Sequence, residues 1–262
     1  MADRAEVLDE FRIAVDGVHL SRAGRRVFQG LSCGFVRGQI TVILGESGAG
    51  KSTLLRLIGG LTRPDSGAVR VAGQDVAALG HADLYRMRDR IGMLFQYGAL
   101  LDSMTVADNV ALPLREHSDR SETEIATEVA RRLDSVGLPD AGPLYPRELS
   151  GGMSRRAALA RALVTEPEIV LCDEPFSGLD PLNVRRIERL LVDLNQRLGL
   201  TMLVASHHLA SSMRMAHRIV FLTEGRAVSG EPDRLADSSE RAIVDFLAAE
   251  RGDEVPAEGS TG

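Results

Sequence analysis

Tryptophan is absent from this 262-residue chain, and aromatic residues make up only 4% of it. Because 44% of the residues are hydrophobic, we expect an ordinary core built from Leu, Val, Ile and Ala. Only two cysteines occur, Cys33 and Cys172, and neither stands in a metal-type spacing. This excludes a dense disulfide framework and favours two reduced thiols.

Long hydrophobic runs and an excess of basic residues are also missing. No stretch approaches the about 20 apolar residues that span a bilayer, and residues 1–10 are acidic, without an apolar export segment. We expect that the chain does not cross a membrane by itself, although it can sit on a membrane protein. The formal net charge of −6 argues against nucleic acid as the main partner, since such proteins usually carry a basic footprint.

Short β-branched runs and helical patterns share the chain. Alternation over 11–20 predicts a strand, and the apolar run 40–44, which ends at glycine, predicts a strand buried on both faces. We expect further strands at 68–71, 91–95, 169–172, 200–205, 219–222 and 226–229, and helices at 51–59, 124–136, 148–163, 182–198 and 241–250.

This order predicts an α/β fold with a single domain over residues 10–250. Its core comprises 10–96 and 165–250, and the helical stretch 97–164 forms an inserted subdomain. Residues 251–262 are polar and are expected to form a loose tail.

The segment after the buried run at 40–44 is typical of a phosphate-binding loop. Residues 45–52 match G-x-x-x-x-G-K-[ST] between a predicted strand and a predicted helix. Glycines let such a loop wrap closely, because a Cβ would block the phosphates or the positive φ angles. Free N–H groups at the helix N-terminus stabilise phosphate oxygens. The predicted ATP contacts are Gly45, Glu46, Ser47, Gly48, Ala49, Gly50, Lys51, Ser52 and Thr53.

Two carboxylates complete the predicted chemistry. Asp173 and Glu174 end a buried strand, and in a parallel sheet such ends face the ligand crevice. We predict that Asp173 and the Ser52 hydroxyl hold Mg2+, while Lys51 reaches the β- and γ-phosphates. Glu174 is then free to polarise the attacking water. The alternative is a salt-bridged surface pair.

Four further motifs carry a family resemblance. Leu149-Ser-Gly-Gly-Met153 resembles the signature motif of ABC-type ATPases, and Gln96 occupies the Q-loop position. Ser177-Gly-Leu-Asp180 is similar to the D-loop, and Ser206-His207 is similar to the switch histidine. The resemblance covers about residues 10–230 in the family's order. It implies a P-loop NTPase fold of ABC type, with a mainly parallel core sheet, an N-terminal antiparallel β part and the helical subdomain.

The resemblance also implies roles for these motifs. His207 would hydrogen-bond the γ-phosphate and join Glu174 as a catalytic residue, and Gln96 would sense Mg2+ and water. Asp180 would link two ATP sites in a homodimer. The signature residues of each subunit would face the γ-phosphate bound by the other; they are Ser150, Gly151 and Gly152. The chain is thus expected to hydrolyse ATP.

Two positions depart from the family pattern. The family commonly stacks an aromatic residue on adenine, and our alignment places Arg22 there, whose guanidinium plane can stack instead. Met153 replaces the usual Gln after the signature glycines, which removes one polar contact near the nucleotide. Neither change touches the catalytic carboxylate.

Within the family, residues 94–117 and 149–162 resemble the ATPases of MCE-type lipid transporters, especially the Mla phospholipid-transport type of Gram-negative bacteria. That resemblance implies two copies of the chain on an integral-membrane permease, with an MCE-domain protein and a STAS-domain protein, at the cytoplasmic face of the inner membrane. The implied cargo is glycerophospholipid. The alternatives are a soluble ABC ATPase in cofactor assembly and a transporter ATPase for another cargo.

Several residues keep two readings. The apolar residues after the Q-loop either contact the permease or belong to the subdomain core; they are Leu100, Leu101, Met104 and Val106. The pairs at 155–156 and 185–186 are interpreted as solvated arginines, with an interface or nucleotide role as the alternative. His208 is expected to be solvated or to cap a helix.

Overall fold

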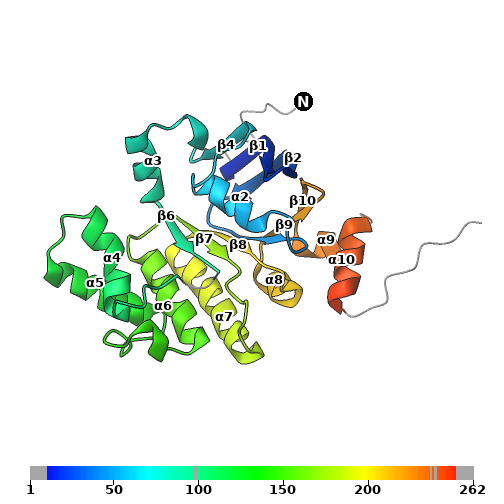
Figure 1. Cartoon of the computed structure of the whole chain (residues 1–262). Helices are drawn as coiled ribbons and strands as arrows, with labels where there is room; N and C mark the ends of the chain where they lie inside the picture. The colour runs from blue at the N-terminus through cyan, green and yellow to red at the C-terminus, as the bar shows by residue number, and fades with distance from the viewer. Residues whose placement is uncertain (1–10, 97–98, 237, 239–240, 252–262) are drawn as a thin grey trace, which may run out of the picture.

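The computed structural model describes residues 11–96, 99–236, 238 and 241–251 (Figure 1). The tail predicted at 251–262 lies outside them except for Arg251, which ends a helix. Among the described helices, none has the length and apolar character that a membrane span requires.

The larger of two sheets has the strand order β10-β9-β3-β8-β7-β6. Its strands are β3 (Ile40–Leu44), β6 (Ile91–Leu94), β7 (Ile169–Asp173), β8 (Thr201–Ala205), β9 (Arg218–Thr223) and β10 (Arg226–Gly230). All pair in parallel except β10, which runs antiparallel to β9. Every residue of β3, β7 and β8 is buried, as expected for a parallel sheet covered on both faces.

The smaller sheet is antiparallel and has the order β2-β1-β4-β5. It comprises β1 (Phe11–Arg22), β2 (Arg25–Val36), β4 (Ser66–Val71) and β5 (Gln74–Asp75). The sequence did not predict β2. Its buried residues are Phe28, Leu31 and Phe35, a spacing closer to that of a helix than to that of a strand, because the β1–β2 register is interrupted by irregularities.

Helices cover both faces of the larger sheet. They are α2 (Lys51–Ile58), α3 (His81–Arg88), α4 (Val106–His117), α5 (Glu122–Ser135), α6 (Gly151–Leu163), α7 (Pro181–Leu198), α8 (Leu209–Met215), α9 (Pro232–Ala236) and α10 (Arg241–Arg251). Short 3₁₀ turns lie at Val76–Ala78 and Pro146–Glu148. The helix predicted at 148–163 therefore begins at Gly151, after the second of these turns.

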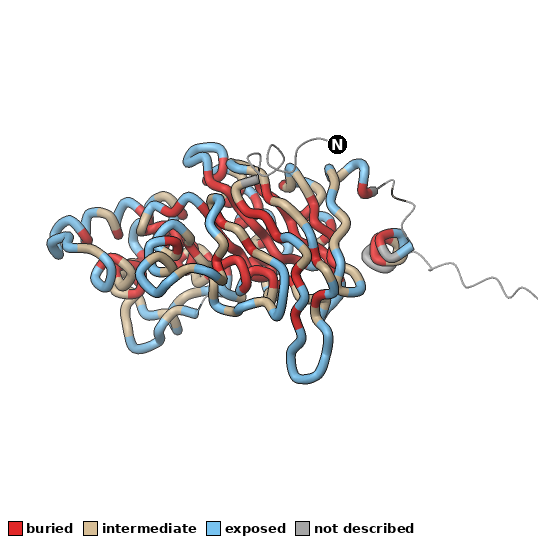
Figure 2. Tube along the Cα trace, turned by 90° about the horizontal axis from the view of Figure 1, so that it is seen from above, coloured by how far each residue is buried: buried red, intermediate tan, exposed pale blue. Residues whose placement is uncertain are grey.

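The sheet separates two hydrophobic clusters, and successive residues of β3 alternate between them. Val42 joins the cluster that holds α4, α5, α6 and α7, whereas Ile43 joins the one with α2 and the antiparallel sheet. Figure 2 shows the buried residues running along the strands through the centre of the molecule. Helices α4, α5 and α6 gather at one end of the molecule (green in Figure 1). The predicted fold class is confirmed.

Strand register brings three chain segments to one edge of the sheet. Ala205 on β8 is the register partner of both Ile43 on β3 and Asp173 on β7. The residues that follow these strands therefore emerge side by side, although they are far apart in the sequence. The candidate site lies at this edge.

Candidate functional site

The loop between β3 and α2 has the backbone that its glycines predict. Gly45, Gly48 and Gly50 have φ values of +147°, +82° and +101°. A Cβ on Gly45 would lie 2.6 Å from the Leu222 carbonyl oxygen, and one on Gly50 would lie 2.7 Å from Cε1 of Phe28. No side chain caps the N-terminus of α2, so its first N–H groups are available to an anion.

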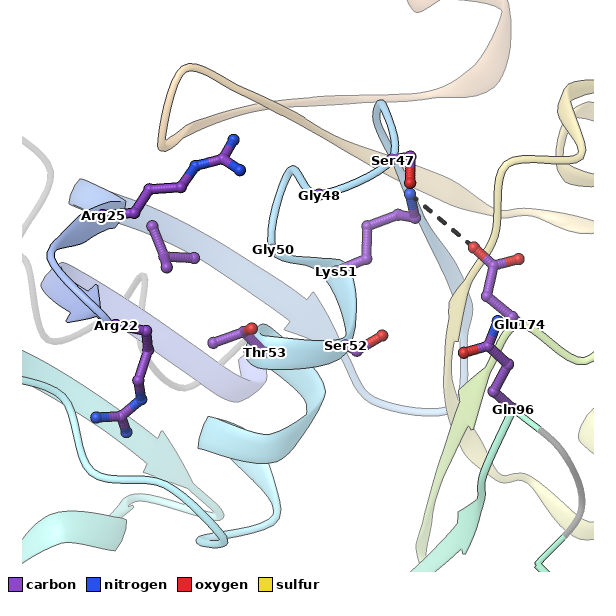
Figure 3. A pocket seen from close by; sticks show the side chains of 11 residues that line it. Arg22, Arg25, Ser47, Gly48, Gly50, Lys51, Ser52, Thr53, Gln96 and Glu174 are labelled. Carbon is purple, nitrogen blue, oxygen red and sulfur yellow. Dashed lines mark ion pairs between the residues drawn. The ribbon is translucent and has the colours of Figure 1, made fainter.

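Lys51 ties this loop to the end of β7. Its Nζ donates to the carbonyls of Gly45 (2.7 Å) and Glu46 (3.0 Å) and lies 3.9 Å from Oε1 of Glu174 (Figure 3). Burial lowers the pKa of Lys51, and the carboxylates of Glu174 and Asp173 oppose that shift. The Lys51 ammonium group therefore lies between the loop and the carboxylates, where it can bind phosphate oxygens.

Ser52 and Asp173 meet although they lie on different elements. The Ser52 hydroxyl donates to Oδ1 of Asp173 at 2.7 Å. Hydroxyl and carboxylate oxygens are the ligands that Mg2+ prefers, so this pair fits that ion. Gln96, the third predicted metal contact, lines a cavity beside the P-loop together with Ser52.

Glu174 and His207 form the second polar pair at this edge. Nδ1 of His207 lies 2.8 Å from Oε2 of Glu174. The glutamate is buried and has a left-handed backbone with a φ of +49°, and its N–H donates to the Ala205 carbonyl at 2.9 Å. Half of the His207 side chain is exposed, so the pair has one face toward solvent.

Lys51, Ser52, Gln96 and Glu174 line a cavity of about 350 Å3, within the usual size range of ligand pockets. Asp173 and His207 bond to two of these lining residues, Ser52 and Glu174. Arg22 and Arg25 lie opposite Glu174 and Gln96 (Figure 3), and Val27 also lines the cavity. Arg22 and Arg25 are register partners across the two-residue turn Ala23-Gly24, so their side chains share one face. Arg22 was predicted from the sequence as a nucleotide contact, whereas Arg25 was not. A two-residue hairpin turn was the available signal.

The signature residues lie outside this cavity. Ser150 is the N-cap of α6 and accepts from the Met153 N–H at 3.3 Å. Gly152 packs against α7 so closely that a Cβ there would lie 2.7 Å from Oδ1 of Asn183. In one chain the P-loop and the carboxylates thus come together without Ser150, Gly151 or Gly152.

Asp180 caps the neighbouring helix. Its Oδ1 accepts from the N–H groups of Leu182 and Asn183, both at 3.0 Å. These bonds, with one from the Asn183 side chain, lower the pKa of Asp180. A Cβ on Gly151 would lie 3.3 Å from Cδ2 of Leu179, so the D-loop and the signature loop lie side by side.

Two expectations need correction, those for the arginine pair at 155–156 and for His208. Arg155 is 7% exposed and Arg156 is half-buried, so this pair is not on a solvated helix face; Arg185 and Arg186 are exposed as expected. The alternatives left open for the apolar residues after the Q-loop divide: Val106 is fully buried in the core and Leu100 packs against that core, whereas Leu101 is 44% exposed. His208 occupies the N-cap position of α8 but makes no side-chain cap, and its half-buried ring packs edge-on to Phe176.

The ABC transporter family model matches residues 28–177. The chain belongs to this family. Its ABC ATPase sequence is 41% identical over 239 residues to the intermembrane phospholipid transport system ATP-binding protein MlaF of Haemophilus influenzae, covering 91% of this chain and 90% of that protein. It is 42% identical over 231 residues to MlaF of Escherichia coli K12, covering 88% and 86%. The probable ribonucleotide transport ATP-binding protein mkl of Mycobacterium tuberculosis is 38% identical, covering 91% and 67%.

Solved structures agree with the family. The dimeric, post-hydrolysis form of the ATP-binding cassette MJ0796, bound to ADP and Pi, matches with a TM-score of 0.77 and 29% identity, over 84% of this chain and 98% of that one. The cbiO1 protein from Clostridium perfringens matches with a TM-score of 0.80 and 27% identity, over 92% and 95%. This ABC ATPase therefore binds and hydrolyses ATP.

Proposed function

We propose that this ABC ATPase is the motor subunit of an Mla-type transporter that moves glycerophospholipid between the inner and outer membranes. The observation that carries the proposal is 41–42% identity to MlaF proteins across about nine-tenths of both chains. The same relationship supports a peripheral location on the inner membrane. The proposed partners are a second copy of this chain, an integral-membrane permease, an MCE-domain protein and a STAS-domain protein. Residues 10–250 would act as one domain, with 97–164 as its helical subdomain.

In the proposed mechanism, the cavity beside the P-loop takes the nucleotide. The P-loop N–H groups and Lys51 bind the phosphates, and Arg22 and Arg25 contact the base side of the nucleotide. Ser52, Asp173 and Gln96 would hold Mg2+, which when bound neutralises charge on the β- and γ-phosphates. Together, the P-loop N–H groups and these side chains position the γ-phosphate in front of Glu174.

Glu174 accepts the proton of the attacking water through the oxygen that His207 leaves available. His207 hydrogen-bonds Oε2 of Glu174 and so orients both the carboxylate and the water. Rate enhancement comes mainly from positioning and charge stabilisation, as is usual in phosphoryl transfer. Closing the site would require Ser150, Gly151 and Gly152 of a second copy, with Asp180 linking the two sites.

An apolar groove beside Gln96 supports contact with a permease. Its lining includes Phe95, Leu101, Leu112 and Pro113, and both Phe95 and Leu101 are exposed. The groove lies between the end of β6 and α4. A helix of the permease seated there would touch the residue that precedes Gln96, and so would sense the nucleotide site.

Affinity purification from detergent-solubilised membranes tests the proposal. The tagged full-length chain should bring down a permease, an MCE-domain protein, a STAS-domain protein and glycerophospholipid, all identified by mass spectrometry. Untagged membranes treated in parallel are the control. A permease without an MCE-domain protein would point to another cargo, as the name of the mkl relative indicates for that protein. Recovery of no permease would contradict the transporter assignment and favour cofactor assembly.

A further inference from the structure

Arg155 joins three segments of the protein that carry different sequence motifs. It lies on α6, the helix that starts at the signature residues. Its Nη1 donates to the Phe95 carbonyl at 3.3 Å, and its Nη2 donates to the Ser177 carbonyl at 3.2 Å. Phe95 immediately precedes Gln96, and Ser177 begins the D-loop.

The two acceptors lie beyond the ends of neighbouring strands. Phe95 follows β6 and Ser177 lies four residues after Asp173, the last residue of β7; β6 and β7 pair in parallel. A guanidinium group offers two parallel donors in a rigid plane, so it fixes the spacing of two carbonyls in a way that a flexible ammonium does not. Arg155 therefore sets how these two strand ends stand relative to α6.

The Ser177 carbonyl belongs to the turn that carries Glu174. The Ser177 N–H donates to the Glu174 carbonyl at 3.2 Å, which closes the turn. Glu174 itself has a φ of +49°, a backbone conformation that costs free energy and persists only where the surroundings hold it. Arg155 bonds to the last residue of this turn, Ser177. Neither Arg155 nor Ser177 lines the nucleotide cavity.

Arg156, the next residue, shows what is particular about Arg155. It also donates to two backbone carbonyls, those of Val136 (3.1 Å) and Gly137 (2.7 Å), but both follow α5 within the helical part. Arg161 further along α6 donates to the Ala99 carbonyl at 2.7 Å, so α6 holds the Q-loop region on both sides of Gln96. The bonds of Arg155, by contrast, reach the ends of both β6 and β7.

We propose that Arg155 is a positioning residue that couples the signature helix to Gln96 and to the Glu174 turn. A displacement of α6 on closure against a second subunit moves the Phe95 and Ser177 carbonyls through this one side chain. Glu174 thereby reaches its working position only when the signature loop is engaged. The inference rests on the proposed roles of Gln96 and Glu174 in hydrolysis.

The test separates kcat from KM in the full-length protein, purified with whatever membrane partners it retains. Arg155→Met keeps the aliphatic stem but removes both donors, so kcat should fall about 10- to 100-fold. The KM for ATP should stay within about threefold, because Arg155 does not line the cavity. Arg155→Lys can reach one carbonyl at a time and should recover part of kcat.

Arg156→Met is the matched control, since Arg156 lies on the same helix and also donates to two backbone carbonyls. Its kcat should stay within about twofold of the wild-type value, although its melting temperature should fall about as much as that of Arg155→Met. Amide hydrogen exchange gives a second readout: Arg155→Met should speed exchange at both Gln96 and 177–180, and Arg156→Met at neither. If Arg155→Met does not fold, Arg155→Lys is measured in its place.

The inference is overturned if the Arg155 variants keep wild-type kcat, or if Arg156→Met lowers kcat as much. It is also overturned if Arg155→Met raises KM while kcat is unchanged. None of these results depends on which permease or lipid is recovered, so failure of the transport proposal is seen separately. Glu174→Gln in the same assay reports independently on the role of Glu174.

Discussion

Nδ1 of His207 lies 2.8 Å from Oε2 of Glu174, although 33 residues separate them in the chain. The other oxygen of Glu174, Oε1, lies 3.9 Å from Nζ of Lys51. The carboxylate is thus anchored by a residue from the end of β8 and by one from the start of α2. This arrangement leads directly to the first prediction.

Glu174→Gln should lower kcat by about 10²- to 10⁴-fold, because the amide is too weak a base to take a proton from water. ATP binding should persist, since the P-loop contacts remain. Steady-state phosphate release and equilibrium nucleotide binding measure the two effects. Glu116→Gln on the exposed face of α4 is the control and should behave as wild type.

His207 should prove non-additive with Glu174. If the two residues act as one unit, Glu174→Gln with His207→Ala should cost little more than Glu174→Gln alone. Additive losses in kcat would mean that His207 works on a different step, independently of the carboxylate.

Ser52→Ala should weaken Mg2+ binding, so that hydrolysis needs more Mg2+, because it removes a hydroxyl that bonds Asp173. The half-saturating Mg2+ concentration is expected to rise about 10- to 100-fold, the range seen when a ligand or its support is lost. Ser52→Thr retains the hydroxyl and serves as the control. An unchanged Mg2+ titration for Ser52→Ala would rule out this pair as the metal site.

Gly152→Ala should lower ATPase activity by pushing the signature loop away from α7. The new Cβ would stand 2.7 Å from Oδ1 and 2.9 Å from Cγ of Asn183. Adding Asn183→Ala removes both atoms, so the double variant should recover activity that the single variant loses. Gly80→Ala, where no atom lies within 4 Å, is the matched control. Absence of recovery would mean that contact with Asn183 is not the cause.

Arg22→Ala and Arg25→Ala should each raise the KM for ATP by about 2- to 30-fold, the equivalent of one guanidinium–π contact of about 0.5–2 kcal/mol. Among the described residues neither guanidinium is in an ion pair, and both arginines line the cavity, where their side chains extend in different directions (Figure 3). Arg63→Ala is the control, since Arg63 is exposed and does not line the cavity. Equal KM values for ATP in all three variants would contradict base contact.

The sequence alone determined the parts of the site that lie within one continuous stretch. The loop at 45–52 follows a buried strand and precedes a helix, and Asp173 and Glu174 end another buried strand, so local patterns were sufficient. The same patterns failed for β2, where bulged pairing put Phe28, Leu31 and Phe35 at helix-like spacing. Residue periodicity reports secondary structure only where pairing is regular.

Only the tertiary structure decided which of these stretches meet. The pairing of Glu174 with His207 depends on β7 and β8 being neighbours, and the bridge made by Arg155 depends on β6 lying beside β7. Arg155 and Arg156 are adjacent and chemically identical in the sequence, yet one spans two strand ends and the other stays within the helical part. Strand order is set by the burial of whole faces across long separations in the chain, and residue spacing along one segment carries no record of it.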